Sequence, residues 1–119
     1  MKKVKYYESY IERYTTIEEQ AVYRYEEKIG YLEKLVDTST HEHVNVILRK
    51  NSFGYWTSYH FESGYVIKPG YRTKNDCLID LHKMLPVLIK RLKEDDVQEG
   101  VKRLEEYKNN ILEGNYEVS

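Results

Sequence analysis

The sequence has almost no cysteine and no long hydrophobic stretch. Cys77 is the single cysteine of 119 residues, so no disulfide can form within the chain, which is typical of a reducing, cytoplasmic compartment. The apolar run at residues 84–89 is far shorter than the roughly 20 residues that span a bilayer. The basic residues at 2–5 are not followed by the apolar stretch of a signal peptide. We therefore expect a cytoplasmic protein without membrane contact.

An excess of charge of either sign is also lacking. The 19 Lys and Arg residues stand against 20 Asp and Glu, which gives a formal net charge of −1. This balance excludes a uniformly basic nucleic-acid binder and a uniformly acidic DNA mimic.

Sequence motifs of enzymes are missing as well. There is no glycine-rich phosphate loop, no HExxH zinc motif and no nucleophile elbow. Cys77 and His82 would lie five positions apart on a helix, which is a poor spacing for a nucleophile and its base. We therefore predict a protein without catalytic residues and without a cofactor.

The histidines form the one pattern that resembles a metal site. His41 and His43 would share one face of a strand, and His60 would lie on a neighbouring strand. Spacing alone does not supply ligand geometry, so we expect surface or turn histidines and no metal.

Tyrosine is the residue that the chain has in abundance, with 13 tyrosines against 2 phenylalanines. A tyrosine ring packs like that of phenylalanine while its hydroxyl stays hydrated. The tyrosines can therefore replace phenylalanine at the edge of a small core, or form an aromatic binding face. The composition leaves both interpretations open.

The first third of the chain predicts one long helix. Thr16-Ile17-Glu18-Glu19 has the pattern of a capping box, and apolar residues then recur at helical spacing. They are Val22, Tyr25, Ile29, Leu32 and Val36. We expect a helix over residues 17–36. Residues 1–14 fit a helical or mixed segment and also an edge strand.

The middle of the chain predicts three strands. Side chains alternate between apolar and polar in residues 43–50 and 55–61, and residues 65–68 form a short third run. Turns are expected at 51–54 and 62–64, and Pro69-Gly70 should end the third strand. Connections this short favour a three-stranded antiparallel meander.

The last third predicts further helix. Thr73 caps a leucine-rich helix that Pro86 should kink or break near Leu85. A third cap at residues 96–99 begins an amphipathic segment that Gly114 should end, and residues 117–119 should fray. We therefore predict a single α+β domain over 1–119, with an N-terminal helix and one kinked or two C-terminal helices packed on one face of the meander.

Charge and aromatic residues are concentrated in the predicted strand region. Residues 41–75 hold five Lys or Arg and only two Glu, and seven Phe, Tyr or Trp lie in residues 53–71. Buried aromatics dominate interface energies, and charges at a rim set orientation and on-rate. The candidate partner-binding residues are therefore the anchors Trp56, Tyr59 and Tyr65 with the rim Arg49, Lys50, Arg72 and Lys74.

Two resemblances bear on function. The order helix, three strands, helix resembles the double-stranded RNA-binding domain, and Gly70-Tyr71-Arg72-Thr73-Lys74 stands where that family has a basic stretch. The resemblance implies that Arg72 and Lys74 contact phosphates, although the bulky Leu78 and Leu81 depart from the family's small-residue pattern. In size and composition, the whole chain is similar to small phage and mobile-element proteins of the anti-CRISPR kind.

The function predicted from these features is non-catalytic binding to a macromolecule. The anti-CRISPR resemblance implies an inhibitor that binds a host-defence or nucleic-acid-processing protein. A small nucleic-acid-binding module is the first alternative, with salt-dependent binding as its signature. A homodimeric structural protein is the second, because the stripe from Val22 to Val36 is close to a heptad pattern.

Overall fold

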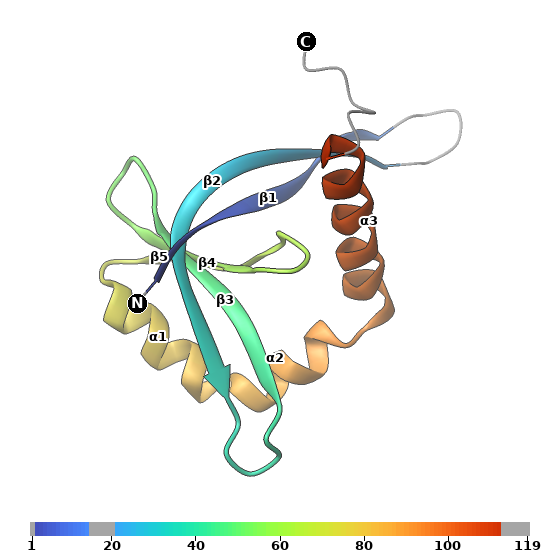
Figure 1. Ribbon diagram of the computed structural model, residues 1–119. Coiled ribbons are helices and arrows are strands. Elements are labelled where there is room, and N and C mark those ends of the chain that lie inside the picture. The colour runs from blue at the N-terminus through green and yellow to red at the C-terminus, as the bar shows by residue number, and fades with distance from the viewer. Residues whose placement is uncertain (1, 15–20, 113–119) are drawn as a thin grey trace.

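The computed structural model describes residues 2–14 and 21–112, which form an antiparallel sheet followed by helices (Figure 1). The five strands lie in chain order across the sheet. They are β1 (Lys2–Tyr14), β2 (Ala21–Val36), β3 (His43–Lys50), β4 (Trp56–His60) and β5 (Val66–Tyr71). The helices are α1 (Lys74–Lys83), α2 (Leu85–Leu92) and α3 (Asp95–Leu112). The predicted α+β class is confirmed.

The N-terminal helix predicted over 17–36 is wrong, because residues 21–36 form β2. The start of that prediction, with its capping box at 16–19, lies outside the described residues. Tyr23, Tyr25, Tyr31 and Leu35 occupy alternate positions, so the segment also carries a strand pattern. β1 pairs with β2 from Lys2 opposite Leu32 to Tyr14 opposite Ala21, and this long partner decides the conformation.

The ambiguous first segment is therefore an edge strand. It pairs with β2 throughout its length, with one register shift between Ile11 and Arg13. The sheet has five strands where three were expected, and its element order differs from that of a double-stranded RNA-binding domain. The heptad stripe of the predicted helix lies in a strand, so it no longer supports a coiled-coil dimer.

The three middle strands are confirmed, with one difference at their end. β5 continues through Pro69 and Gly70 to Tyr71, so the expected stop at Pro69-Gly70 is wrong. Lys68 lies opposite Ser58 and Tyr71 opposite Trp56, which leaves Pro69 and Gly70 in an irregularity of the edge strand. An edge strand tolerates proline because one of its sides needs no hydrogen bonds.

Pro86 breaks the helical segment as predicted. α1 ends at Lys83 and α2 begins at Leu85, with the proline in its first turn, where no backbone donor is needed. Thr73 caps α1 by accepting a hydrogen bond of 3.0 Å from the Asp76 amide. Together with α3, the described part of the chain has three C-terminal helices. The prediction was one kinked helix or two helices. No helix in residues 2–14 and 21–112 is long and apolar enough to cross a membrane.

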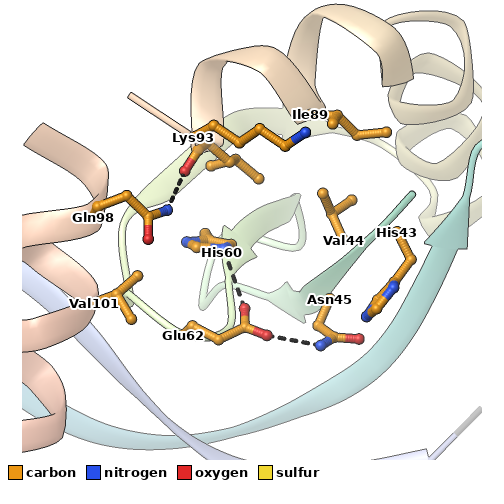
Figure 2. Close-up of a pocket in the computed structure, with 10 residues that line it drawn as sticks. His43, Val44, Asn45, His60, Glu62, Ile89, Lys93, Gln98 and Val101 are labelled. Carbon is orange, nitrogen blue, oxygen red and sulfur yellow. Dashed lines mark hydrogen bonds and ion pairs between the residues drawn. The ribbon is translucent and has the colours of Figure 1, made fainter. Parts of the chain in front are cut away.

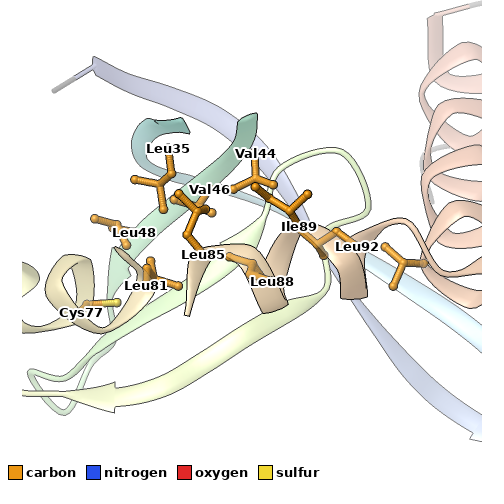
Figure 3. Close-up of a cluster of buried hydrophobic side chains, with 11 residues drawn as sticks. Leu35, Val44, Val46, Leu48, Cys77, Leu81, Leu85, Leu88, Ile89 and Leu92 are labelled. Carbon is orange, nitrogen blue, oxygen red and sulfur yellow. The ribbon is translucent and has the colours of Figure 1, made fainter. Parts of the chain in front are cut away.

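The main core lies between one face of the sheet and helices α1 and α2 (Figure 3). The helices contribute apolar residues at spacings of three and four, which places them on one side. The strands contribute alternate positions of β3 and the end of β2. The buried members are Leu35, Val44, Val46, Leu48, Cys77, Leu81, Leu85, Leu88, Ile89, Leu92 and Val97.

The opposite face of the sheet is also partly closed, because the long β1–β2 ribbon curves back over it (Figure 1). The turn between β4 and β5 meets β1, where the Ser9 amide donates a hydrogen bond of 2.9 Å to the Gly64 carbonyl. Gly64 has φ +75°, and a Cβ there would lie 2.2 Å from the Tyr7 carbonyl oxygen. Tyr6 and Ile47 are consequently buried on this face.

Many of the tyrosines hold α3 against the rest of the molecule. Tyr107 of α3 contacts Tyr25, with ring centroids 4.5 Å apart, and Tyr7, at 5.7 Å. The guanidinium of Arg103 lies 3.6 Å from the Tyr23 ring centroid and donates to the Tyr65 hydroxyl at 3.0 Å. These contacts account for much of the tyrosine content as packing between elements.

Candidate functional site

The structure distributes the seven predicted partner-binding residues over three places. Arg49 and Tyr59 lie on the curved face of the sheet that faces away from α1 and α2. The Tyr65 ring packs on α3, where a Cβ added to Gly100 would lie 2.6 Å from it. The other four lie together at the end of the sheet beside α1; they are Lys50, Trp56, Arg72 and Lys74.

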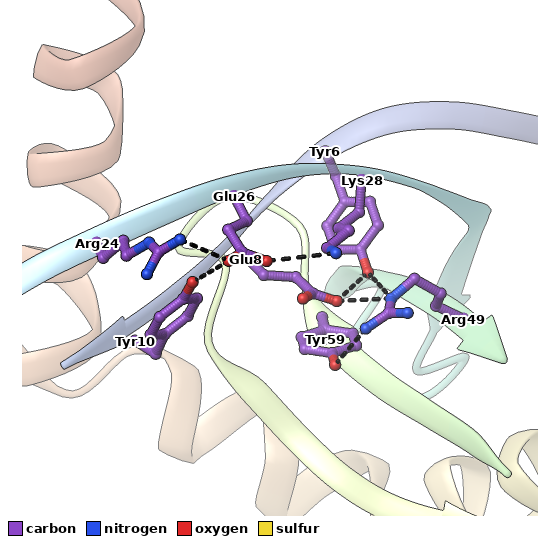
Figure 4. Close-up of polar contacts among 8 residues, drawn as sticks. All are labelled: Tyr6, Glu8, Tyr10, Arg24, Glu26, Lys28, Arg49 and Tyr59. Atoms are coloured by element: carbon purple, nitrogen blue, oxygen red, sulfur yellow. Dashed lines mark hydrogen bonds and ion pairs between the residues drawn. The ribbon is translucent and has the colours of Figure 1, made fainter. Parts of the chain in front are cut away.

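Arg49 belongs to a polar cluster on the curved face (Figure 4). Its Nε donates to Glu8 Oε1 at 2.6 Å and to the Tyr6 hydroxyl at 3.0 Å, while its Nη2 lies 3.5 Å from the Tyr59 hydroxyl. Tyr6 in turn donates to Glu8 at 2.7 Å. Burial and the Glu8 carboxylate raise the pKa of Tyr6, so this hydroxyl remains a neutral donor. The charge of Arg49 is therefore matched within the fold.

A second group in Figure 4 lies farther along the same face. Glu26 is approached by Arg24 at 3.2 Å and Lys28 at 3.3 Å, and Tyr10 donates a hydrogen bond to it. The hydrogen bond from Tyr10, followed by that from Lys28, lowers the pKa of Glu26. The cations on this part of β2 are thus also neutralised by their neighbours.

The third place has a different electrostatic character, and we call it the basic–aromatic surface. It consists of Lys3, Tyr31, Lys50, Trp56 and Lys74. We include the exposed Arg72, because it directly follows Tyr71, which lies opposite Trp56. Lys50 lies opposite Trp56 across β3 and β4, and the Trp56 and Tyr31 rings are 6.0 Å apart. Lys74 Nζ stands 4.9 Å from the Tyr31 ring centroid and 5.8 Å from that of Trp56.

The basic–aromatic surface lacks acidic partners. Among the side chains that the structure describes, no carboxylate comes within 4.0 Å of any of its four cations. Lys68 on the adjacent strand differs, because Asp80 lies 3.1 Å from its Nζ. Sequence reasoning missed Lys3, whose segment it left open between helix and edge strand, and Tyr31, whose segment it predicted as a helix. Strand alternation in β2 was the signal that could have found Tyr31.

Tyr71 and Asp80 form the boundary of the basic–aromatic surface. The Tyr71 hydroxyl donates a hydrogen bond to Asp80, which also binds Lys68. Burial, together with this hydrogen bond, raises the pKa of Tyr71. The hydrogen bond from Tyr71, followed by that from Lys68, lowers the pKa of Asp80. Lys68 is therefore neutralised by Asp80, whereas Lys50 and Arg72 can offer their charges to a partner.

A pocket of about 220 Å³ lies at another place, between the sheet, α2 and α3 (Figure 2). His43 and His60 both line it, whereas His41 lies in the preceding turn with φ +61°. In the described part of the chain, no three His, Cys, Asp or Glu side chains are grouped in a way that could hold a metal ion. The pocket instead contains the pair formed by His60 Nε2 and Glu62 Oε2, at 3.1 Å.

His60 also links Glu62 to Ser63, since its Nδ1 lies 2.7 Å from Ser63 Oγ. A serine, a histidine and a carboxylate that contact one another in series resemble a nucleophile with its base. Ser63 is fully buried, however, and its Oγ accepts a hydrogen bond of 3.2 Å from the Tyr65 amide. A buried hydroxyl cannot reach a substrate, so we interpret this chain as a means of fixing the turn between β4 and β5.

Comparison with protein-family models, with curated proteins and with solved structures finds no match to this chain. The roles of its residues therefore follow from geometry, burial and charge.

Proposed function

We propose that this protein is a non-catalytic binding module that docks on an acidic patch of a protein partner through its basic–aromatic surface. The observation that carries the proposal is the set of four cations without a carboxylate within 4.0 Å in the described part of the chain. Elsewhere on the molecule Lys5, Lys28 and Lys93 each have an acidic neighbour. Lys34, Lys90 and Lys102 also have none among the described side chains, but, unlike Lys3 and Lys74, they do not lie over an aromatic ring there. In a chain with net charge −1, such a local excess of positive charge favours an anionic partner.

The rings beneath the lysines strengthen this proposal. Lys74 lies over two aromatic rings and Lys3 over one, so both ammonium groups are held in place before a partner arrives. Association normally costs about 0.5–1.5 kcal/mol for each flexible side chain that it immobilises. Cations ordered in advance on aromatic rings lose less of this freedom, which favours binding.

A protein partner fits this surface better than a nucleic acid. Base stacking requires an accessible aromatic face. Trp56 is packed against the core and Tyr31, and Lys74 lies over both rings. Phosphate contacts by Arg72 and Lys74 remain the alternative, which the experiment below distinguishes.

The experiment compares two triple variants that lose the same amount of charge. The first is Lys50→Gln, Arg72→Gln and Lys74→Gln; the control is Lys34→Gln, Lys90→Gln and Lys102→Gln, all exposed and without a carboxylate within 4.0 Å in the described residues. Fluorescence anisotropy measures binding to poly-L-glutamate, to duplex RNA and to single-stranded DNA over a salt series.

We expect the wild-type protein to bind poly-L-glutamate most tightly at low salt. The first variant should lose at least about tenfold in affinity, while the control changes by less than about threefold. Equal loss in both variants would show that net charge alone acts, and would contradict the proposal. Tighter binding to either nucleic acid than to the polypeptide would favour the nucleic-acid module instead.

The basic–aromatic surface does not by itself indicate that the protein is an inhibitor. It depends on the size and composition shared with anti-CRISPR proteins, and it stays a prediction. Homodimerisation also stays a prediction, and a mass measurement in solution tests it.

A further inference from the structure

The turn between β3 and β4, residues 51–55, carries the most exposed large apolar side chain of the described residues. Phe53 is 85% exposed, followed by Val87 at 68%. Figure 1 shows that the hairpin formed by these strands projects from the body of the molecule. Burial of a phenylalanine side chain contributes roughly 1.5–3 kcal/mol, which the isolated fold does not obtain here. Single exposed apolar residues are common on protein surfaces, so exposure alone does not indicate a site.

The backbone that carries Phe53 is held in place by Asn51. The side-chain oxygen Oδ1 of Asn51 accepts hydrogen bonds from the amides of Phe53 and Tyr55, both at 3.0 Å. The Asn51 amide donates to the Tyr55 carbonyl at 2.8 Å, and the Gly54 amide donates to the Asn51 carbonyl at 3.0 Å. Gly54 has φ +88°, which a residue without a Cβ adopts easily. The turn is therefore ordered before a partner binds, which lowers the entropic cost of association.

The turn is continuous with the basic–aromatic surface. Lys50, the last residue of β3, lies opposite Trp56 and precedes the turn directly. A Cβ added to Gly54 would lie 3.9 Å from Lys50 Cε, so the lysine side chain lies along the turn. Tyr55, which is 44% exposed, adds a second aromatic side chain. A partner that reaches Lys50 therefore also meets Phe53, and an aromatic anchor beside a charged rim is typical of protein interfaces.

The shape of the hairpin favours a folded protein over a nucleic acid or a bilayer. Single-stranded nucleic acids are bound in basic grooves in which several rings stack on successive bases, whereas this hairpin projects outward. Binding to a bilayer strengthens with the apolar area inserted, and this turn offers only Phe53 and Tyr55. A pocket on a protein can enclose a single ring. Since Lys50 has no carboxylate within 4.0 Å among the described side chains, carboxylates at the rim of that pocket would complement its charge.

We propose that Phe53 is the hydrophobic anchor of the interface and inserts into an apolar pocket of the partner protein, with carboxylates at the rim of the pocket facing Lys50. This inference rests on the proposed function, because it takes the acidic patch from there and adds an apolar pocket beside it. Trp56, the anchor expected from the sequence, instead packs against the core and Tyr31. Phe53 is the aromatic side chain of this region that the fold leaves free to insert.

Three ligands separate the effect of charge from that of a pocket. Poly-L-glutamate has charge only, neutral β-cyclodextrin has an apolar pocket only, and carboxymethyl-β-cyclodextrin has a pocket with carboxylates at its rim. Fluorescence anisotropy measures the first, and ¹H–¹⁵N correlation spectra of the full chain measure the other two. We expect saturable shifts at residues 52–55, with the carboxymethyl form bound at least about threefold more tightly than the neutral form at low salt. Lys50→Gln should remove this preference, whereas Lys34→Gln should keep it.

Variants of Phe53 test the anchor itself. Phe53→Ser should abolish binding of both cyclodextrins, while its affinity for poly-L-glutamate changes by less than about twofold. Phe53→Leu should retain part of the cyclodextrin binding, because an apolar side chain remains at the tip. Val87→Ser is the matched control, since it removes the next most exposed apolar side chain, on α2, and should leave every affinity unchanged.

Equal affinity of the wild type for the two cyclodextrins, or unchanged binding in Phe53→Ser, would overturn this inference and leave the proposed function standing. Absence of binding to poly-L-glutamate would contradict the proposed function, whatever the cyclodextrins show. Single-stranded DNA or phosphatidylserine vesicles are the remaining ligands to compare. If either binds more tightly than carboxymethyl-β-cyclodextrin and is lost in Phe53→Ser, Phe53 serves base stacking or membrane contact, and the inference is wrong.

Discussion

Arg49 Nε lies 2.6 Å from Glu8 Oε1, although the two residues are 41 positions apart in the chain. The side chain of Glu8 is only 10% exposed and that of Arg49 24%, so water screens the pair weakly. The pair joins the edge strand β1 to the central strand β3 across the curved face of the sheet (Figure 4). It also explains why a cation that looked available to a partner is used inside the fold.

Glu8→Gln is expected to destabilise the protein by about 2–4 kcal/mol, because it leaves the Arg49 charge unpaired in a half-buried position. The measurement is urea-induced unfolding followed by circular dichroism. Glu27→Gln is the matched control, since its partner Lys5 is largely exposed, and it should cost less than about 1 kcal/mol. Equal effects of the two substitutions would contradict a structural role for the Glu8–Arg49 pair.

Glu62 should make the protein sensitive to acid. Its pKa is lowered from 4.5 in the folded protein, so the unfolded chain takes up a proton first as the pH falls. The stability that the carboxylate contributes is present above about pH 4.5 and is lost as the pH falls through its folded pKa. Free energies of unfolding from neutral pH down to about pH 3 should therefore fall less steeply in Glu62→Gln than in the wild type. Parallel curves would show that the carboxylate does not have this linkage.

Gly64→Ala should be much more damaging than Gly70→Ala, although both residues have positive φ. A Cβ at Gly64 would lie 2.2 Å from the Tyr7 carbonyl oxygen, whereas nothing lies within 4 Å of one at Gly70. The second substitution adds only backbone strain, about 1–2 kcal/mol. The first must also break the contact between the β4–β5 turn and β1, so we expect at least about 2 kcal/mol more. Thermal unfolding of both variants tests this order, and similar melting temperatures would argue against the contact.

Arg103→Ala should loosen the attachment of α3. The guanidinium stacks on Tyr23 and donates to the Tyr65 hydroxyl, so its loss removes a cation–π contact and a hydrogen bond. We expect a destabilisation of about 1–2 kcal/mol, with faster amide hydrogen exchange in α3 than in β3. Lys102→Ala, at the exposed neighbouring position, should change neither quantity. Unchanged exchange in α3 of the Arg103 variant would show that other contacts hold the helix.

Local sequence signals determined β3, β4 and the helices. Alternation over 43–50, the Thr73 cap and Pro86 each act within a few residues, so their effects appear without knowledge of the rest of the chain. Residues 21–36 carry both a helical and a strand pattern, and a local signal could not choose between them. The long antiparallel partner β1 made the choice.

The residues of the basic–aromatic surface likewise fall into two groups, those that local sequence signals identified and those that strand pairing placed there. Lys50, Trp56, Arg72 and Lys74 were found from the sequence because they surround β4 and the start of α1, where the local prediction held. Lys3 and Tyr31 join them only through the pairing of β1 with β2. That pairing also places Glu8 beside Arg49, which withdraws Arg49 from the surface. Composition and local pattern thus determined β3, β4 and the C-terminal helices. Pairing between strands tens of residues apart decided which charges remain unpaired. The physical reason is that a charge is neutralised by whatever lies near it in space, which local sequence does not specify.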